Sequence, residues 1–244
     1  MKSIALIAIL TTAAIAQDAP APAPAPADAK PKRTLLKYIV PANATTGNRT
    51  SGDGGSRADK ELLPKHSVLA PNHTAFTTQA QPTLYWYQDG PIQKNSVATI
   101  EVALIDPKIP KPLLKTAFAI AGEKDRGAGI HSLKLARYKV TLEPGIEYKW
   151  SVALVPNAKD RSQDSLATGM IKRIEPAAEL TAELAKKDAD KATAYATNGV
   201  WYDALAAISE QIIAAPKDAD LRAVRANLLE QAGLKSAADS ERKH

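Results

Sequence analysis

The sequence predicts a β-sandwich of about seven antiparallel strands followed by an all-α tail of helical repeats. Between residues 66 and 175, apolar and polar residues alternate at a period of two, with Pro and Gly between the runs. From Pro176 onward the apolar period becomes helical, and Ala, Leu, Glu and Lys dominate. We therefore divide the chain into a signal peptide (1–16), a disordered leader (17–62), a β-sandwich (63–175) and a helical-repeat tail (176–244).

The first residues have the three zones of an export signal. Lys2 supplies the positive charge, residues 4–15 are apolar or small, and Ala14 and Ala16 form the small-x-small pattern that a signal peptidase requires. An apolar run of roughly 12 residues is too short to span ~30 Å of hydrocarbon as a helix. We expect cleavage after Ala16, export to the periplasm or the extracellular space, and no integral membrane segment in the mature chain.

The leader has the composition of a disordered segment. Ala and Pro alternate from Ala19 to Ala27, which is typical of a stiff polyproline-like spacer. Residues 43–60 are rich in Asn, Thr, Gly, Ser, Arg and Asp and contain no apolar cluster. We expect residues 17–62 to be disordered, with Leu35 to Val40 pairing or docking weakly.

Charge and cysteine content exclude several functions. The formal net charge is +6, and the basic residues are spread along the chain rather than gathered into the stripe that neutralises phosphates, so no nucleic acid partner is expected. The absence of cysteine excludes disulfides, thiolate metal sites and thiol nucleophiles.

The clearest strand runs from Glu147 to Val155, where Tyr148, Trp150, Val152 and Leu154 fall on one face. The remaining predicted strands are Thr83–Tyr87, Val97–Ile105, Leu113–Ala119, Ile130–Leu135 and Ser165–Ile174, with Val68–Ala70 at an edge.

A turn motif precedes the clearest strand. The run Leu142-Glu-Pro-Gly-Ile-Glu-Tyr148 resembles the Leu-x-Pro-Gly-x-x-Tyr pattern of fibronectin type III and related sandwiches. The resemblance implies an immunoglobulin/fibronectin-like sandwich in which Tyr148 is a corner residue, its ring in the core and its hydroxyl bonded to the preceding loop.

The tail has a repeat spacing. Gly199 and Gly233 are thirty-four residues apart, and so are Ala204 and Ala238, with Pro216 after the second helix. This pattern resembles the tetratricopeptide repeat. Fewer than two full repeats cannot cover both apolar sides of the helices, so we expect the tail to dock on the sandwich. The apolar residues available for docking are Trp201, Tyr202, Leu205, Ile208 and Ile212.

Four segments of the chain carry a further resemblance: Ser67–Pro71, Gln81–Tyr87, Leu142–Trp150 and Tyr195–Leu205. Together they resemble a family of exported bacterial proteins, the domain-of-unknown-function family number nine hundred and twenty-eight. The resemblance covers about residues 62–234, and it implies neither a reaction nor a ligand.

No pattern in the sequence argues for catalysis, a metal or a cofactor. His66, His73 and His131 lack a metal-ligand spacing and are interpreted as structural. No Gly-x-Ser-x-Gly elbow indicates a hydrolase. The carboxylate pairs Glu123/Asp125 and Asp160/Asp164 lie among basic residues, as in solvated loops, with a calcium site as the alternative.

The candidate binding surface comprises Tyr85, Tyr87, Trp201 and Tyr202. Strand alternation places Tyr85 and Tyr87 on one face, where they either form an exposed pair that stacks on sugar rings or receive the helical tail. The leading hypothesis is a non-enzymatic exported envelope protein that holds another protein. The alternative is a carbohydrate- or peptidoglycan-binding module that uses the two tyrosines. The expected partner is therefore an unknown envelope protein or a cell-wall polysaccharide.

Overall fold

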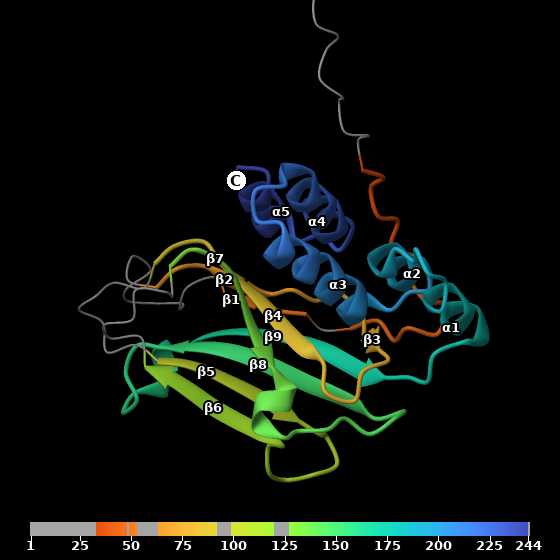
Figure 1. Cartoon of the computed structure of the whole chain (residues 1–244). Helices are drawn as coiled ribbons and strands as arrows, with labels where there is room; N and C mark the ends of the chain where they lie inside the picture. Colours follow the sequence, from red (N-terminus) through yellow and green to blue (C-terminus); the bar gives the residue numbers. More distant parts are fainter. Residues whose placement is uncertain (1–32, 48, 53–62, 92–98, 120–126, 244) are drawn as a thin grey trace, which may run out of the picture. The chain divides into compact units, whose positions relative to one another are not determined.

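The computed structural model describes residues 33–47, 49–52, 63–91, 99–119 and 127–243. The predicted signal peptide and much of the predicted leader lie outside the described residues. Figure 1 shows the C-terminal helices over a sheet that contains β2, β4 and β7, with the β5, β6, β8 and β9 strands beyond it. Two sheets and a helical tail therefore account for the described chain.

The sheet nearer the helices has the strand order β1-β2-β4-β7 in the described residues, and its pairs are antiparallel. In register, Ser51 lies opposite Ser67 and Ser67 opposite Tyr87. Trp86 lies opposite His131. The strands are β1 (Ser51–Gly52), β2 (His66–Val68), β4 (Thr83–Gln88) and β7 (Gly129–Lys134).

The second sheet has the order β3-β9-β8-β5-β6 in the same part of the chain. The inward side chains of its central strand β8 form the sandwich core, because Tyr148 is 2% exposed and Trp150, Val152 and Leu154 are 0% exposed. The strands are β3 (Ala75–Thr77), β5 (Thr99–Ile105), β6 (Leu114–Ala119), β8 (Glu147–Val155) and β9 (Ser165–Arg173).

The strand prediction is confirmed for the long strands and needs three corrections. β1 and β3 were not predicted, because two and three residues are too few to show a period. The sandwich is also not wholly antiparallel, since β3 pairs with β9 in parallel. The strand predicted at Val68–Ala70 lies instead at His66–Val68, and it is not at an edge, because it pairs with both β1 and β4.

The predicted tyrosine corner is present. The Glu143 amide donates a hydrogen bond of 3.0 Å to the Tyr148 hydroxyl. Gly145 between them has a φ of 78°, a left-handed conformation that favours glycine.

The tail contains, in the described residues, a short first helix and two helical hairpins. The hairpins are α2 with α3 and α4 with α5, and they turn at Gly199 (φ 74°) and Gly233 (φ 71°). The thirty-four-residue spacing therefore places the two glycines in equivalent left-handed turns. The helices are α1 (Ala178–Leu184), α2 (Lys191–Thr197), α3 (Trp201–Ala214), α4 (Ala219–Gln231) and α5 (Lys235–Glu241).

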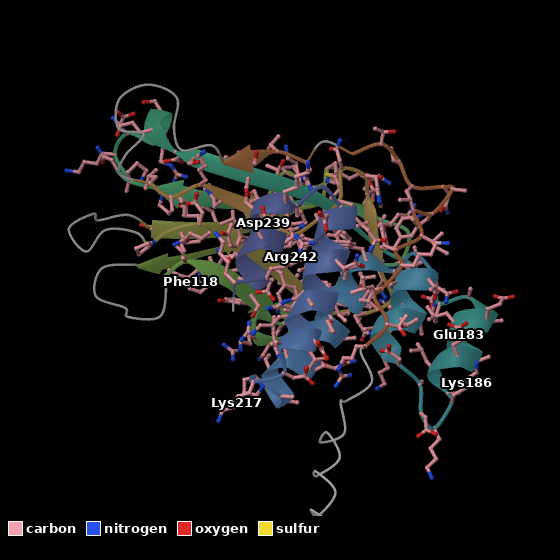
Figure 2. The ribbon with its side chains drawn as sticks, turned by 90° about the horizontal axis from the view of Figure 1, so that it is seen from above. Phe118, Glu183, Lys186, Lys217, Asp239 and Arg242 are labelled. Carbon is pink, nitrogen blue, oxygen red and sulfur yellow. The ribbon has the colours of Figure 1, made fainter. Side chains whose placement is uncertain are left out.

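Seen from above, the helices lie over the strands, with Asp239 and Arg242 at α5 (Figure 2). These two side chains form an exposed ion pair of 3.1 Å.

Candidate functional site

The four aromatic residues predicted as a binding surface are all buried. Tyr85 and Tyr87 are each 7% exposed, Tyr202 is 1% exposed and Trp201 is 0% exposed. Of the two arrangements considered for Tyr85 and Tyr87, the covered one is observed. Burial raises the pKa of the Tyr85 hydroxyl. An exposed aromatic pair for stacking on sugar rings is therefore not present.

Trp201 and Tyr202 join the tail to the sandwich by hydrogen bonds. The Trp201 indole N–H donates to the Leu69 carbonyl at 2.8 Å. The Tyr202 hydroxyl accepts from the Trp150 indole at 2.8 Å and donates to the Met170 carbonyl at 3.0 Å. The predicted docking of the tail on the sandwich is confirmed by these contacts.

A buried carboxylate next to these aromatics was missed by sequence reasoning. Asp203 is 4% exposed and accepts hydrogen bonds from the Thr77 hydroxyl at 2.5 Å and from the Thr78 amide at 2.9 Å. Burial raises the pKa of Asp203, although the hydrogen bonds act in the opposite direction. A lone acidic residue inside the apolar run of α3 was the available signal. Its bonds tie the end of β3 to α3.

Residues 33–41, which we call the N-terminal segment, lie along the helical tail. Leu36 is 3% and Tyr38 8% exposed, so both side chains are buried. The backbone between them bonds to Gln231 at the end of α4. The Gln231 carboxamide donates to the Leu36 carbonyl at 2.8 Å and accepts from the Tyr38 amide at 2.9 Å. Two buried side chains and these bonds order this stretch, in agreement with the expected docking of Leu35 to Val40 and unlike the disorder expected over the leader as a whole.

Two further contacts fix this segment on α2. The Ile39 amide donates to the Ala196 carbonyl at 3.1 Å. Pro41 and the Ile39 carbonyl lie against the Gly199 turn, where a Cβ would approach them to 2.6 and 2.9 Å. Gly199 is thus required both by its left-handed conformation and by the close approach of the N-terminal segment.

The Tyr38 ring completes an aromatic group around the joint. It packs edge-on against Trp201, with ring centroids 5.1 Å apart, and stacks on His73 at 5.9 Å. Burial raises the pKa of the Tyr38 hydroxyl. The N-terminal segment therefore contacts both the tail and the sandwich.

A cleft of about 230 Å³ lies where the strands β1, β2 and β4 face the turn between α4 and α5. Its lining includes Arg49, Lys65, Lys235 and Asp89. Arg49 donates to the carbonyls of Ala70 at 2.9 Å and Ala232 at 2.8 Å, so its guanidinium closes the C-terminal end of α4. The charge of the lining residues is mainly positive.

The histidines bond to backbone carbonyls. His66 contacts the Val152 carbonyl at 3.1 Å, His73 the Thr74 carbonyl at 3.0 Å, and His131 the Gly127 carbonyl at 2.9 Å. His131 also stacks on Trp86, with centroids 5.4 Å apart. In the described ranges, no group of three or more His, Asp or Glu side chains is placed to hold a metal.

The described helices include none that is both long and apolar enough to cross a membrane. A comparison with curated proteins finds no match. The family model DUF928, Domain of Unknown Function, matches residues 46–242. This range includes both described sheets and most of the helical tail. The chain therefore belongs to the DUF928 family.

Proposed function

We propose that this protein is a non-enzymatic exported envelope protein that serves as a protein-interaction module, and that its helical tail binds an extended peptide segment. The observation that carries the proposal is the paired hydrogen bonding of Gln231 to Leu36 and Tyr38.

This pairing recognises backbone rather than side chain. The Gln231 carboxamide bonds a carbonyl and an amide two residues apart, which is the pattern that one strand offers to the next in a sheet. The carboxamide is itself oriented by the Asn227 side chain, whose oxygen accepts from Gln231 at 2.8 Å. Backbone bonds of this kind give affinity to an extended peptide, and pockets for alternate side chains give selectivity. Here those pockets contain Leu36 and Tyr38.

The repeat character of the tail supports the same reading. We classify the tail as tetratricopeptide-like on its glycine spacing, and the sandwich as immunoglobulin/fibronectin-like on its tyrosine corner. Stacked helical repeats form concave surfaces that bind extended partners. In this chain, the surface of α2 and α4 carries the N-terminal segment, which lies before residue 46, where the family match begins.

Export completes the proposal. Lys2, the apolar run and Ala16 favour a cleaved signal, so the partner would be met in the periplasm or outside the cell. Mass spectrometry of the mature protein should give Gln17 as its first residue. The alternative, a carbohydrate-binding module that uses Tyr85 and Tyr87, requires the tail to leave the sheet, because both rings are buried.

Binding of a separate peptide tests the surface of α2 and α4 that carries the N-terminal segment, which we call the peptide groove. The mature chain carrying Leu36→Ala and Tyr38→Ala should bind a fluorescent peptide of residues 33–47, measured by anisotropy. The wild-type chain should bind the peptide at least about tenfold more weakly, since its own segment competes at an effective millimolar concentration. Adding Gln231→Ala to the double variant should remove the gain.

Two controls make the result specific. A peptide with Ala at both buried positions should not bind, and the exposed Lys37→Ala substitution in the chain should leave wild-type behaviour unchanged. Thermal melts verify that each variant is folded. If a folded double variant binds no peptide, or binds it equally well without Gln231, the proposal fails.

A further inference from the structure

We propose that the cleft between strands β1, β2 and β4 and the α4–α5 turn binds a small ligand that carries an oxyanion group, a carboxylate or a phosphate, next to hydroxyl groups. This site goes beyond the proposed peptide groove, with which it shares no lining residue.

The positive charges of the cleft come from three separate places in the chain. Arg49 precedes β1, Lys65 precedes β2, and Lys235 begins α5. In the part of the chain that the structure describes, none of the three forms an ion pair with a carboxylate. Asp89 is the opposing charge on the lining. Three cations against one carboxylate favour an anionic occupant.

Arg49 is the strongest reason to expect a counter-ion. Its guanidinium is fixed by the carbonyls of Ala70 and Ala232, and it is partly buried. Burying a cation is costly unless it is paired, and carbonyl dipoles offset only part of that cost. An oxyanion in the cleft would supply the missing charge to a donor that is already oriented.

Hydroxyl groups line the floor of the same cleft. Ser51, Ser67 and Tyr87 follow one another across three strands in register, so their side chains lie in one row on the sheet. A row of hydroxyls can bond either to an oxyanion or to ligand hydroxyls. An ionised Asp89 carboxylate accepts hydrogen bonds and cannot donate them, which favours a ligand that also carries hydroxyl donors.

The size of the cleft limits the occupant. A volume of about 230 Å³ corresponds to about eight water molecules at ~30 Å³ each. That is enough for a phosphate or for one monosaccharide acid, and less than the ~300 Å³ at which pockets for drug-sized molecules begin. We therefore identify the ligand class as a sugar acid or sugar phosphate, or one such terminal group of a larger molecule.

Titration of the mature protein tests the site. We would follow backbone amide NMR signals of Ser67, Gly233 and Ser236 while adding inorganic phosphate, D-glucuronate or neutral D-glucose. Phosphate or glucuronate should give saturable shifts at these positions, and glucose should not. If only phosphate saturates, the site is an oxyanion site restricted to phosphates, which still supports the proposal.

Matched charge variants decide whether binding is local. The double substitution Lys65→Gln with Lys235→Gln should raise the dissociation constant at least about tenfold. The control pair Lys186→Gln with Lys217→Gln lowers the net charge equally, on exposed positions of the tail (Figure 2). The proposed site would be overturned if both variant pairs weakened binding equally, or if glucose bound as tightly as glucuronate. It would also be overturned if no anion gave saturable shifts. None of these readouts depends on Gln231, so the two proposals can fail separately.

Discussion

The two left-handed turn glycines of the tail form a matched pair that can test the N-terminal segment. Gly199→Ala and Gly233→Ala both place a Cβ at a φ above 70°, which costs about 1–2 kcal/mol in either turn. The surroundings of the two new methyl groups differ. At Gly233 the nearest atom within reach is an Arg49 side-chain nitrogen at 3.7 Å, an ordinary contact.

At Gly199 the added Cβ would lie 2.6 Å from the Pro41 ring and 2.9 Å from the Ile39 carbonyl. These distances are too short to persist, so either the turn or the N-terminal segment must move. Overpacking of this kind adds about 1–3 kcal/mol to the loss of stability. We therefore expect Gly199→Ala to lower the free energy of unfolding by about 1–3 kcal/mol more than Gly233→Ala.

Urea unfolding measures the difference, and trypsin locates it. Cleavage after the exposed Lys37 should accelerate in Gly199→Ala, because the Tyr38 amide leaves Gln231 when the segment lifts. It should not accelerate in Gly233→Ala. Equal losses of stability together with equal cleavage rates would refute the idea that this segment presses on the α2–α3 turn.

The remaining predictions concern buried polar groups. Asp203→Ala removes the acceptor of two threonines and should lower the free energy of unfolding, measured in urea, by about 2–4 kcal/mol. The control Asp239→Ala, at an exposed position, should lower it by at most about 0.5 kcal/mol, and equal losses would contradict the prediction. Because burial raises the pKa of Asp203, its stabilising contribution is full below the ordinary carboxyl value and is lost as pH rises through the raised value. The stability of wild type relative to Asp203→Asn should therefore fall with pH in that window, and a flat difference would exclude the shift. Tyr148→Phe should cost about 0.5–1.5 kcal/mol and Trp150→Ala about 3–5 kcal/mol in thermal melts, and a Tyr148→Phe variant as stable as wild type would leave the corner bond without a role.

The elements with several periods of regular sequence could be predicted. The strand Glu147–Val155 was predicted with the bounds that the structure has, because four large apolar residues alternate with polar ones. The equivalent turns at Gly199 and Gly233 were expected from their thirty-four-residue spacing together with the resemblance to the tetratricopeptide repeat. A local pattern is enough to predict an element when its apolar residues recur at a regular spacing and all face the same core.

The parts that could not be predicted depend on contacts between distant residues. Leu36 and Tyr38 lie in a stretch of ordinary composition, and their partner Gln231 is 195 and 193 residues away. Weak docking of Leu35 to Val40 could be expected, but nothing local shows that a carboxamide of α4 will bond the backbone there. The cleft has the same origin, since the pairing of β1 with β2 brings Arg49 near Lys65 and the docked tail adds Lys235.

The docked tail also decides which surfaces remain for a partner. Each indole and hydroxyl at the joint has a partner across it: Trp201 bonds to Leu69, and Tyr202 to both Trp150 and Met170. Separating the tail would expose two large rings and exchange their hydrogen bonds for bonds to water, so the main cost is the lost apolar burial, at ~25 cal/mol per Å². A ligand that needs the covered aromatics must supply that free energy before it gains any contact. A partner that replaces the N-terminal segment, or an anion that enters the cleft, leaves the joint intact. We therefore expect binding at these two proposed sites to cost less than binding at the covered aromatics.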